Sequence, residues 1–141
     1  MKNLLAATQT AVFRALKTLE SDADLLAATG GKMKVYTHVP ENVKPPFLKI
    51  GQLSSANEAE GYDQVERVTV EVIAIWRGAG NSGLLAMIHS AQAVLDGQEG
   101  LSEDAQIQPP YMLNKEVSEA AADGETYVGV INFEMLVEPA E

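Results

Sequence analysis

The sequence predicts an α+β domain with helices packed on one face of an antiparallel sheet. Two long segments place apolar residues three or four positions apart, as amphipathic helices do, and two others alternate apolar with polar residues, as half-buried strands do. The expected order is ααβββαββ, with about four to five strands in an antiparallel or mixed sheet. No repeat or linker divides the 141 residues, so we expect one domain over 1–141.

The N-terminal part predicts two helices. Residues 3–20 are expected to form the first, with an apolar stripe made by Leu5, Val12, Leu16 and Leu19. Ser21 is expected to cap a short second helix, and Gly30-Gly31 to end it, because glycine accepts the left-handed conformation that follows many helices. Residues 34–37 predict a short extended segment, and the prolines within 39–46 exclude regular structure there.

Two strands separated by a long polar connection are expected next. Phe47 to Leu53 predicts the first strand, and residues 54–64 predict a long hairpin excursion. Val65 to Arg77 is the clearest strand, because one of its faces is apolar throughout: Val68, Val70, Val72, Ala74 and Trp76. Charges on its other face, at Arg67 and Glu71, indicate a half-buried strand and therefore an antiparallel sheet.

The last part of the chain predicts two more strands. Residues 107–118 have an extended pattern that Pro109-Pro110 interrupts, which indicates an edge strand or a bulged one. Residues 127–137 alternate again and predict the final strand. The predicted core, where the helices meet the sheet, includes Val70, Val72, Ile88, Leu95, Ile131 and Phe133.

Charge and composition exclude several classes of function. The chain has 10 Lys+Arg against 20 Asp+Glu, a net charge of −10, and no basic cluster, so specific binding to the phosphates of DNA is not expected. Cysteine is absent, which excludes disulfides, Cys-ligated zinc, iron–sulfur clusters and thiol catalysis. No apolar run reaches the length of about 18 residues that a membrane span needs, and we expect neither secretion nor a membrane location.

One glycine motif requires a choice between two interpretations. Gly78 to Gly83 matches G-x-G-x-x-G, follows a strand and opens the third helix, which Asn81 or Ser82 caps. A dinucleotide site would need a buried parallel strand before the motif, whereas this strand carries charges, and the next strand contains prolines. Leu84-Leu85 also stand where a phosphate loop requires lysine and a hydroxyl. The motif therefore favours a glycine-rich turn between strand and helix.

The remaining polar residues indicate no catalytic or metal centre. His89 is expected on the flank of a helix and His38 in a solvent-exposed loop. Ser90 follows His89 and Asp96 is nearby, but no motif marks the strained nucleophile turn or the oxyanion hole that a hydrolase triad needs. The acids Glu58, Glu60, Asp63 and Glu66 match no calcium-loop spacing. We therefore predict no catalytic residue, no metal ligand and no cofactor. Trp76 is expected in the core, with an interface anchor as the alternative.

The order of several weak motifs resembles a known family. Val35-Tyr36 and Val39-Pro40 precede the stretch 45–51, Pro-Pro-Phe-Leu-Lys-Ile-Gly; a strand at 67–77 runs from Arg-Val-Thr-Val into Ile-Trp-Arg; and 130–137 closes the chain. In this order, over about residues 4–138, the chain resembles the phage tail-completion proteins, often called tail terminators, of long-tailed phages and gene transfer agents. The double proline at 109–110 departs from that pattern.

The resemblance implies a mechanical function in the virion and no catalytic residues. It implies a hexameric ring at the head-proximal end of the tail, which stops polymerisation of the tube and offers a surface to the head. The implied partners are further copies, the tail tube protein and head–tail connector or neck proteins, with DNA passing through the lumen unbound and assembly in the bacterial host cytoplasm. Two alternatives stay open: another head–tail joining protein, and a ligand-binding module or enzyme using Gly78–Gly83.

Two segments are expected to supply the interfaces of such a ring. The polar excursion 54–64 is the first, with Glu58, Glu60, Tyr62 and Asp63 as candidate contacts, because long loops on small domains commonly carry function. The proline-marked edge strand is the second, with Pro109, Pro110 and Tyr111, because free sheet edges pair readily with other chains.

Overall fold

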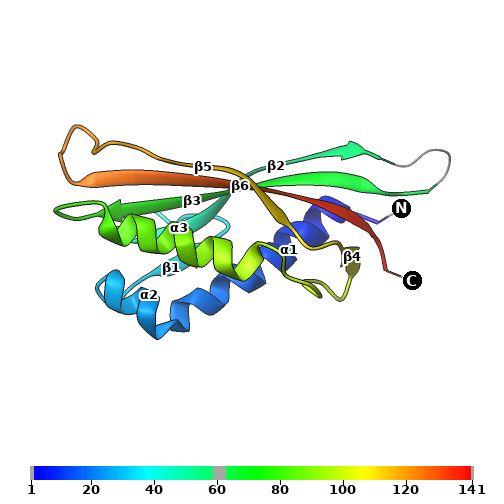
Figure 1. Cartoon of the computed structure of the whole chain (residues 1–141), viewed down its shortest axis with the longest axis horizontal. Coiled ribbons are helices and arrows are strands. Elements are labelled where there is room, and N and C mark those ends of the chain that lie inside the picture. Colours follow the sequence, from blue (N-terminus) through cyan, green and yellow to red (C-terminus); the bar gives the residue numbers. More distant parts are fainter. Residues whose placement is uncertain (1, 59–62, 141) are drawn as a thin grey trace.

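A six-stranded mixed sheet carries its helices on one face (Figure 1). The computed structural model describes residues 2–58 and 63–140. The helices are α1 (Leu4–Lys17), a 3₁₀ turn (Thr18–Ser21), α2 (Ala23–Ala28) and α3 (Ser82–Leu95). The strands are β1 (Lys34–Tyr36), β2 (Phe47–Asn57), β3 (Glu66–Arg77), β4 (Ala105–Ile107), β5 (Tyr111–Val117) and β6 (Thr126–Pro139). Together they confirm the predicted α+β class, with one more strand than the upper prediction because the proline-marked segment divides.

The first predicted helix and its boundary with the second are corrected by the structure. The α-helix ends at Lys17, and the expected residues 18–20 belong to the 3₁₀ turn. The cap of α2 is Asp22, not Ser21: the Asp22 backbone is extended, as an N-cap requires, and its carboxylate accepts a hydrogen bond from the Leu25 amide at 3.0 Å. Gly30 and Gly31, with φ of 80° and 88°, follow the end of α2 as predicted.

The sheet is mixed because β1 runs parallel to β2. Lys34 to Tyr36 lies beside Phe47 to Lys49, and the proline-containing segment 37–46 connects the two strands. All other neighbouring strands are antiparallel, in the order β1-β2-β3-β6-β4, with β5 also pairing with β6. Of the two predicted sheet types, the mixed sheet is therefore the one observed.

The expected excursion at 54–64 begins later than predicted. Residues Ser54 to Asn57 continue β2 and pair with β3 down to Glu66. The ladder continues one step further, where the Glu58 amide donates to the Val65 carbonyl at 2.8 Å. These residues are exposed and all but Ala56 have polar side chains. A ladder needs only backbone groups, so side-chain polarity did not reveal the strand.

The predicted single strand at 107–118 is two strands on the same side of β6. β4 pairs with the end of β6, β5 pairs with its first part, and Gln108 to Pro110 lies between them. Proline has no amide proton for a ladder, so the strand breaks where the two prolines stand. The Gln108 amide still donates to the Leu136 carbonyl at 2.9 Å, so the segment between β4 and β5 stays hydrogen-bonded to β6.

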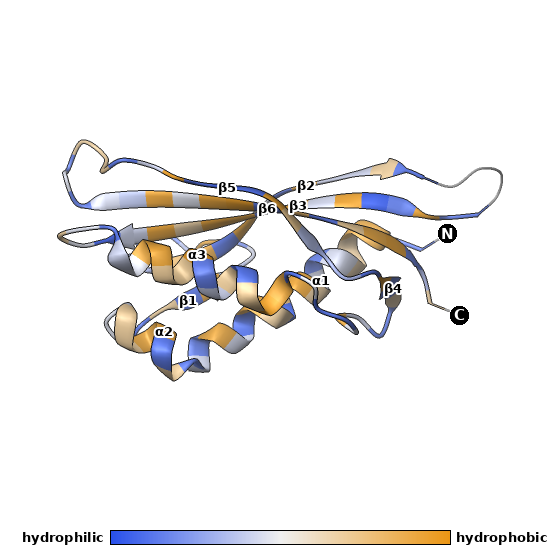
Figure 2. Ribbon diagram, viewed as in Figure 1, coloured by the Kyte–Doolittle hydropathy of each residue, from blue (hydrophilic) through white to orange (hydrophobic). Residues whose placement is uncertain are grey.

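The core lies between the sheet and the helices, and apolar residues recur along both the helices and the strands (Figure 2). All six predicted core residues are buried, and Phe133 and Ile131 are fully enclosed. The stripe of α1 is rotated from the predicted one: Leu5 is half-buried, whereas Leu4, Thr8 and Ala11 are buried. Thr8 is accommodated there because its hydroxyl donates to the Leu4 carbonyl at 2.7 Å. None of the helices in the described part has the length and apolar character of a membrane span.

Candidate functional site: a polar network on the open face of the sheet

The face of the sheet opposite the helices has an apolar half and a polar half. Along β3 and β6, the residues that point away from the helices include Ile73 and Val130 toward one end, paired with each other in register. Toward the other end the open face carries Arg67 on β3 and Glu134 on β6. We call this the open face, because the described helices all lie on the other side (Figure 1).

Four side chains meet on the polar half of the open face. The Arg67 guanidinium donates through Nε to Glu58 Oε1 at 2.6 Å and through Nη1 to Glu134 Oε1 at 2.6 Å. The Tyr111 hydroxyl donates to the same Glu134 oxygen, and Arg67 Nη1 lies 3.4 Å from the Tyr111 oxygen. We call Glu58, Arg67, Tyr111 and Glu134 the polar network.

The sheet register brings these four residues together from distant parts of the chain. Glu58 follows the last residue of β2, and Arg67 lies opposite Ala56 on the neighbouring strand. Tyr111 opens β5 directly opposite Glu134 of β6. Arg67 and Glu134 are diagonal neighbours on β3 and β6, within reach of long side chains. The network thus spans the sheet from the end of β2 to the start of β5.

The hydrogen bonds and charges in the network shift the pKa values of its four side chains. The Tyr111 hydroxyl and then the Arg67 guanidinium lower the pKa of the Glu134 carboxyl, and the Arg67 hydrogen bond lowers the pKa of Glu58. In return Glu58 and then Glu134 raise the pKa of Arg67, and the Glu134 carboxylate raises the pKa of Tyr111. The side chain of Arg67 is 40% exposed and that of Glu134 16%, so water and salt reach the network. Near neutral pH it carries two carboxylates and one guanidinium, all paired.

The predicted interface residues other than the two prolines divide into three groups. Glu58 and Tyr111, predicted from different segments, are brought together by the network. Asp63 is exposed and takes no part in it, and Glu60 and Tyr62 lie outside the described residues. Arg67 and Glu134, which join the network, were missed as site residues. Their signal was present, because both are charges on the polar side of otherwise alternating strands.

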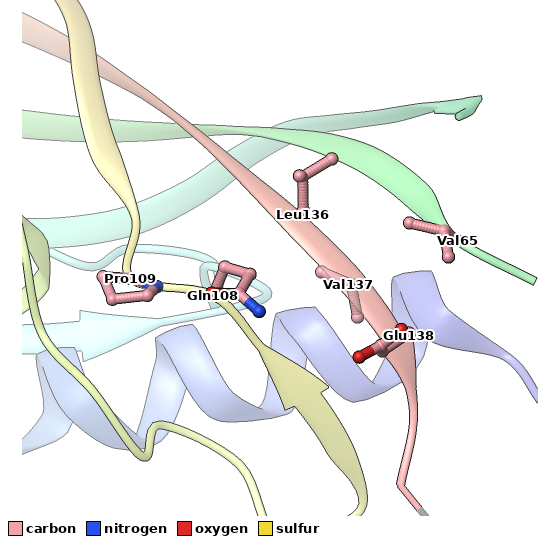
Figure 3. Close-up of a pocket in the computed structure, with 6 residues that line it drawn as sticks. All are labelled: Val65, Gln108, Pro109, Leu136, Val137 and Glu138. Carbon is pink, nitrogen blue, oxygen red and sulfur yellow. The ribbon is translucent and has the colours of Figure 1, made fainter. Parts of the chain in front are cut away.

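The predicted prolines lie apart from the network. Pro110 is buried, and its carbonyl accepts a hydrogen bond from the Gly97 amide at 2.7 Å. Pro109 is exposed and lines a shallow groove of about 360 Å³ beside the end of β6 (Figure 3). The lining is largely apolar, and its residues are Val65, Gln108, Pro109, Leu136, Val137 and Glu138. The break between β4 and β5 therefore creates a second surface feature beside the final strand.

The glycine motif at 78–83 surrounds an aromatic side chain. The Trp76 indole donates from Nε1 to the Gly80 carbonyl at 2.8 Å. A Cβ atom added at Gly83 would lie 2.6 Å from ring atoms of Trp76, and one at Gly78 would lie 2.9 Å away. These two glycines are therefore required for close approach to the indole. Trp76 is half-buried and packs against the core from the end of β3, which agrees with its predicted core role.

The histidines of the described residues lie apart from any cluster of metal-ligand side chains. His38 is exposed, as predicted, and His89 lies exposed on α3. Within 2–58 and 63–140 no group of three or more His, Asp or Glu side chains could hold a metal ion. The same part of the chain contains no buried side-chain nitrogen or oxygen without a hydrogen-bond partner. Chemically, the arrangement offers paired charges, sheet edges and a shallow groove, which are elements of protein–protein contact.

Comparison with known proteins identifies the family. Residues 10–138 match the family model described as tail completion protein gp17. This chain belongs to the gp17 family of tail completion proteins. Among solved structures, 31 chains match this tail completion protein. One comes from a structure described as the virion of a native gene transfer agent particle, with a TM-score of 0.78 and 18% sequence identity. The alignment covers 98% of this chain and 99% of that one, so the whole fold is shared. No curated protein matches the sequence.

For a tail completion protein, the relevant site is a contact surface. The resemblance found in the sequence is confirmed by the family match, and the shared fold includes the β-sheet that carries the polar network. The surfaces that remain as candidates for contact are the polar network, the groove beside β6 and the exposed edges of the sheet.

Proposed function

We propose that this tail completion protein forms a ring, of six copies, at the head-proximal end of a phage-type tail, where it ends the tail tube and offers a joining surface to the head. The observation that carries the proposal is family membership over residues 10–138. The full-length likeness to a chain from a gene transfer agent particle supports it, because that chain is part of a virion. In this proposal the chain acts by contact and catalyses no reaction.

The physical properties of the chain support a role in a closed ring. A cyclic ring needs two different surfaces on each copy, one of which contacts the other on the neighbour. The sheet provides different strands at its two sides, with β2 and β1 on one and β5 and β4 on the other. A net charge of −10 also suits a ring through which DNA passes without binding, because like charges repel the phosphates.

The proposed partners are further copies, the tail tube protein, and connector or neck proteins on the head side. The segment around Glu58 and Asp63 remains a candidate contact with the tube or a neighbour, since both residues are exposed between the end of β2 and the start of β3. Pro109 and Tyr111 are candidates for the same reason on the β5 side. The proposed location is the virion, after assembly in the host cytoplasm.

Deleting the gene from the particle-producing genome tests this proposal directly. We expect electron micrographs of the deletion strain to show tails of abnormal, variable length without heads, and a plasmid copy of the gene to restore joined tails of uniform length. Tails of normal length that fail to join heads would instead indicate the alternative, a head–tail joining protein. Intact, joined particles of normal length would contradict both.

A further inference from the structure

The two sides of the sheet each leave a short stretch of strand edge uncovered among the described residues. On one side, β1 covers β2 only from Phe47 to Lys49, so the second half of β2 has no strand beside it. On the other side β5 is outermost and pairs only with β6. The start of β5 is covered, because the Met112 amide donates to Asp96 Oδ1 at 3.1 Å, which leaves 113–117. Both uncovered stretches are largely exposed.

The backbone of β2 directs hydrogen-bonding groups outward at alternate residues. The Glu58 amide donates to the Val65 carbonyl, and antiparallel ladders alternate between residues that face the partner strand and residues that face away. Counting back from Glu58, the amide and carbonyl groups of Leu53 and Ser55 point away from β3. Their side chains lie on the helix-covered face, because they pair in register with two buried residues, Val70 and Val68.

The backbone of β5 also directs hydrogen-bonding groups outward, at the opposite side of the sheet. The Ser118 amide donates to the Val128 carbonyl at 2.8 Å, so the alternation turns the backbone groups of Lys115 and Val117 away from β6. These two residues pair in register with Ile131 and Gly129, again on the helix-covered face. The outward-facing residues of both edges therefore present their side chains to the same face of the sheet.

The strand directions of the two edges are also complementary. The neighbours β2, β3, β6 and β5 are antiparallel in turn, so β5 runs opposite to β2. Rotation about a ring axis keeps the direction of every strand relative to that axis. A β5 edge placed beside the β2 edge of the next copy is therefore antiparallel to it, like the other long neighbours, and the helices of both copies stay on one face.

We propose that copies of this chain join edge to edge, with β5 of one copy adding as an antiparallel strand to the second half of β2 in the next. The proposal rests on the proposed ring and names its contact. In one register Lys115 lies opposite Ser55 and Val117 lies opposite Leu53. This register pairs two polar residues with each other and two apolar residues with each other. Both apolar residues are half-buried and already pack against the core.

Cysteine cross-linking tests this pairing, because the chain contains no cysteine of its own. In the proposed register Glu116 and Ser54 form a non-hydrogen-bonded pair with Cα atoms about 4.5 Å apart, within the range that a disulfide spans. Both side chains are exposed on the open face. On oxidation we expect the Ser54→Cys/Glu116→Cys variant to lose its monomer band and form a ladder of covalent multimers on non-reducing gels. Either single variant can form only dimers.

A second double variant serves as the matched control. Ser54→Cys/Asp24→Cys keeps one edge cysteine and moves the other to an exposed position on α2, away from β5. If the edge variant forms covalent multimers no more strongly than this control does on the gel, the edge proposal is overturned, even if light scattering shows rings. Conversely, a specific ladder combined with normal tails in the gene-deletion strain would keep the contact and reject the role in ending the tail.

Proline variants give an independent check of the backbone geometry. Ser55→Pro removes an amide that points outward, so we expect unchanged thermal stability and a loss of self-association. Ser54→Pro removes an amide directed at β3, so we expect a lower melting temperature as well. Self-association that survives Ser55→Pro in a folded protein would contradict the proposal.

Discussion

Arg67 connects three other side chains that the sequence places far apart. It pairs with Glu58 and Glu134, and the Tyr111 hydroxyl completes the network on Glu134. The network is partly exposed, so its effect on the free energy of unfolding is reduced by solvent. Its structural effect is to tie the end of β2 to the start of β5 across two intervening strands.

Replacing Arg67 tests this connection through its dependence on pH. The native-state pKa values of Glu58 and Glu134 are lowered, so their pairing stabilises the fold above the ordinary pKa of 4.5 and is lost as pH falls through the native-state values. We expect Arg67→Ala to lower the melting temperature at pH 7, and the difference from the parent to shrink below about pH 4.5. Thermal unfolding followed by circular dichroism between pH 3 and pH 7 measures both.

The matched control for that experiment is Arg14→Ala, which removes an exposed arginine from α1. It makes the same change in net charge without touching the network. If the two variants show the same loss at pH 7, the effect comes from net charge and the network does not stabilise the fold.

Gly83 gives a second prediction at the residue scale. It lies in the first turn of α3, where alanine would normally favour the helix by about 1 kcal/mol. Its added Cβ would meet the Trp76 ring, which the hydrogen bond to Gly80 holds in place. We expect Gly83→Ala to destabilise the protein by about 1–3 kcal/mol through overpacking, and to shift the emission of the single tryptophan.

Gly80→Ala is the control for this prediction, since no atom lies within 4 Å of an added Cβ there. We expect Gly80→Ala to change neither the midpoint in urea nor the emission spectrum. A Gly83→Ala protein as stable as the parent would show that the indole moves aside without cost.

The final strand β6 is the central element of the sheet. It pairs with β3 on one side and with β4 and β5 on the other, and its buried face contacts the helices. Phe133 is fully buried on that face. We expect Phe133→Ala to lower the free energy of unfolding by about 3–5 kcal/mol, because the lost contacts leave a cavity. Urea denaturation measures the change.

An exposed residue on the neighbouring helix provides the comparison for β6. Leu85 of α3 is 49% exposed, so Leu85→Ala should change stability by only about 0.5 kcal/mol. If Phe133→Ala cost no more than Leu85→Ala, the side chain at 133 would not be part of the core.

At the scale of the whole molecule, net charge opposes assembly. Each copy carries −10, so copies that approach one another repel, and salt screens this repulsion over a Debye length of about 8 Å at 0.15 M. We therefore expect self-association to increase when sodium chloride rises from about 0.05 to about 0.5 M, since hydrogen bonds between strand edges are little affected. Light scattering at constant protein concentration measures it. Dissociation by salt would instead indicate an interface built on ion pairs.

The sequence by itself determined the class of the fold, the core and the faces of the long strands. Alternation in 65–77 and 127–137 assigned the buried side correctly, because burial on a half-covered strand is a local, two-residue pattern. The glycine pair at 30–31 and the family resemblance were also present in the residues themselves. Such features require no knowledge of which segments meet.

Only the tertiary structure decided which strands pair, where they end and which side chains meet. The extension of β2 to Asn57, the parallel β1 and the division into β4 and β5 all depend on backbone hydrogen bonds to distant segments. The polar network depends on the same pairing, since its residues come from separate strands or strand ends. Backbone groups are the same in nearly every residue, so the pattern of side chains along one segment does not encode its partner.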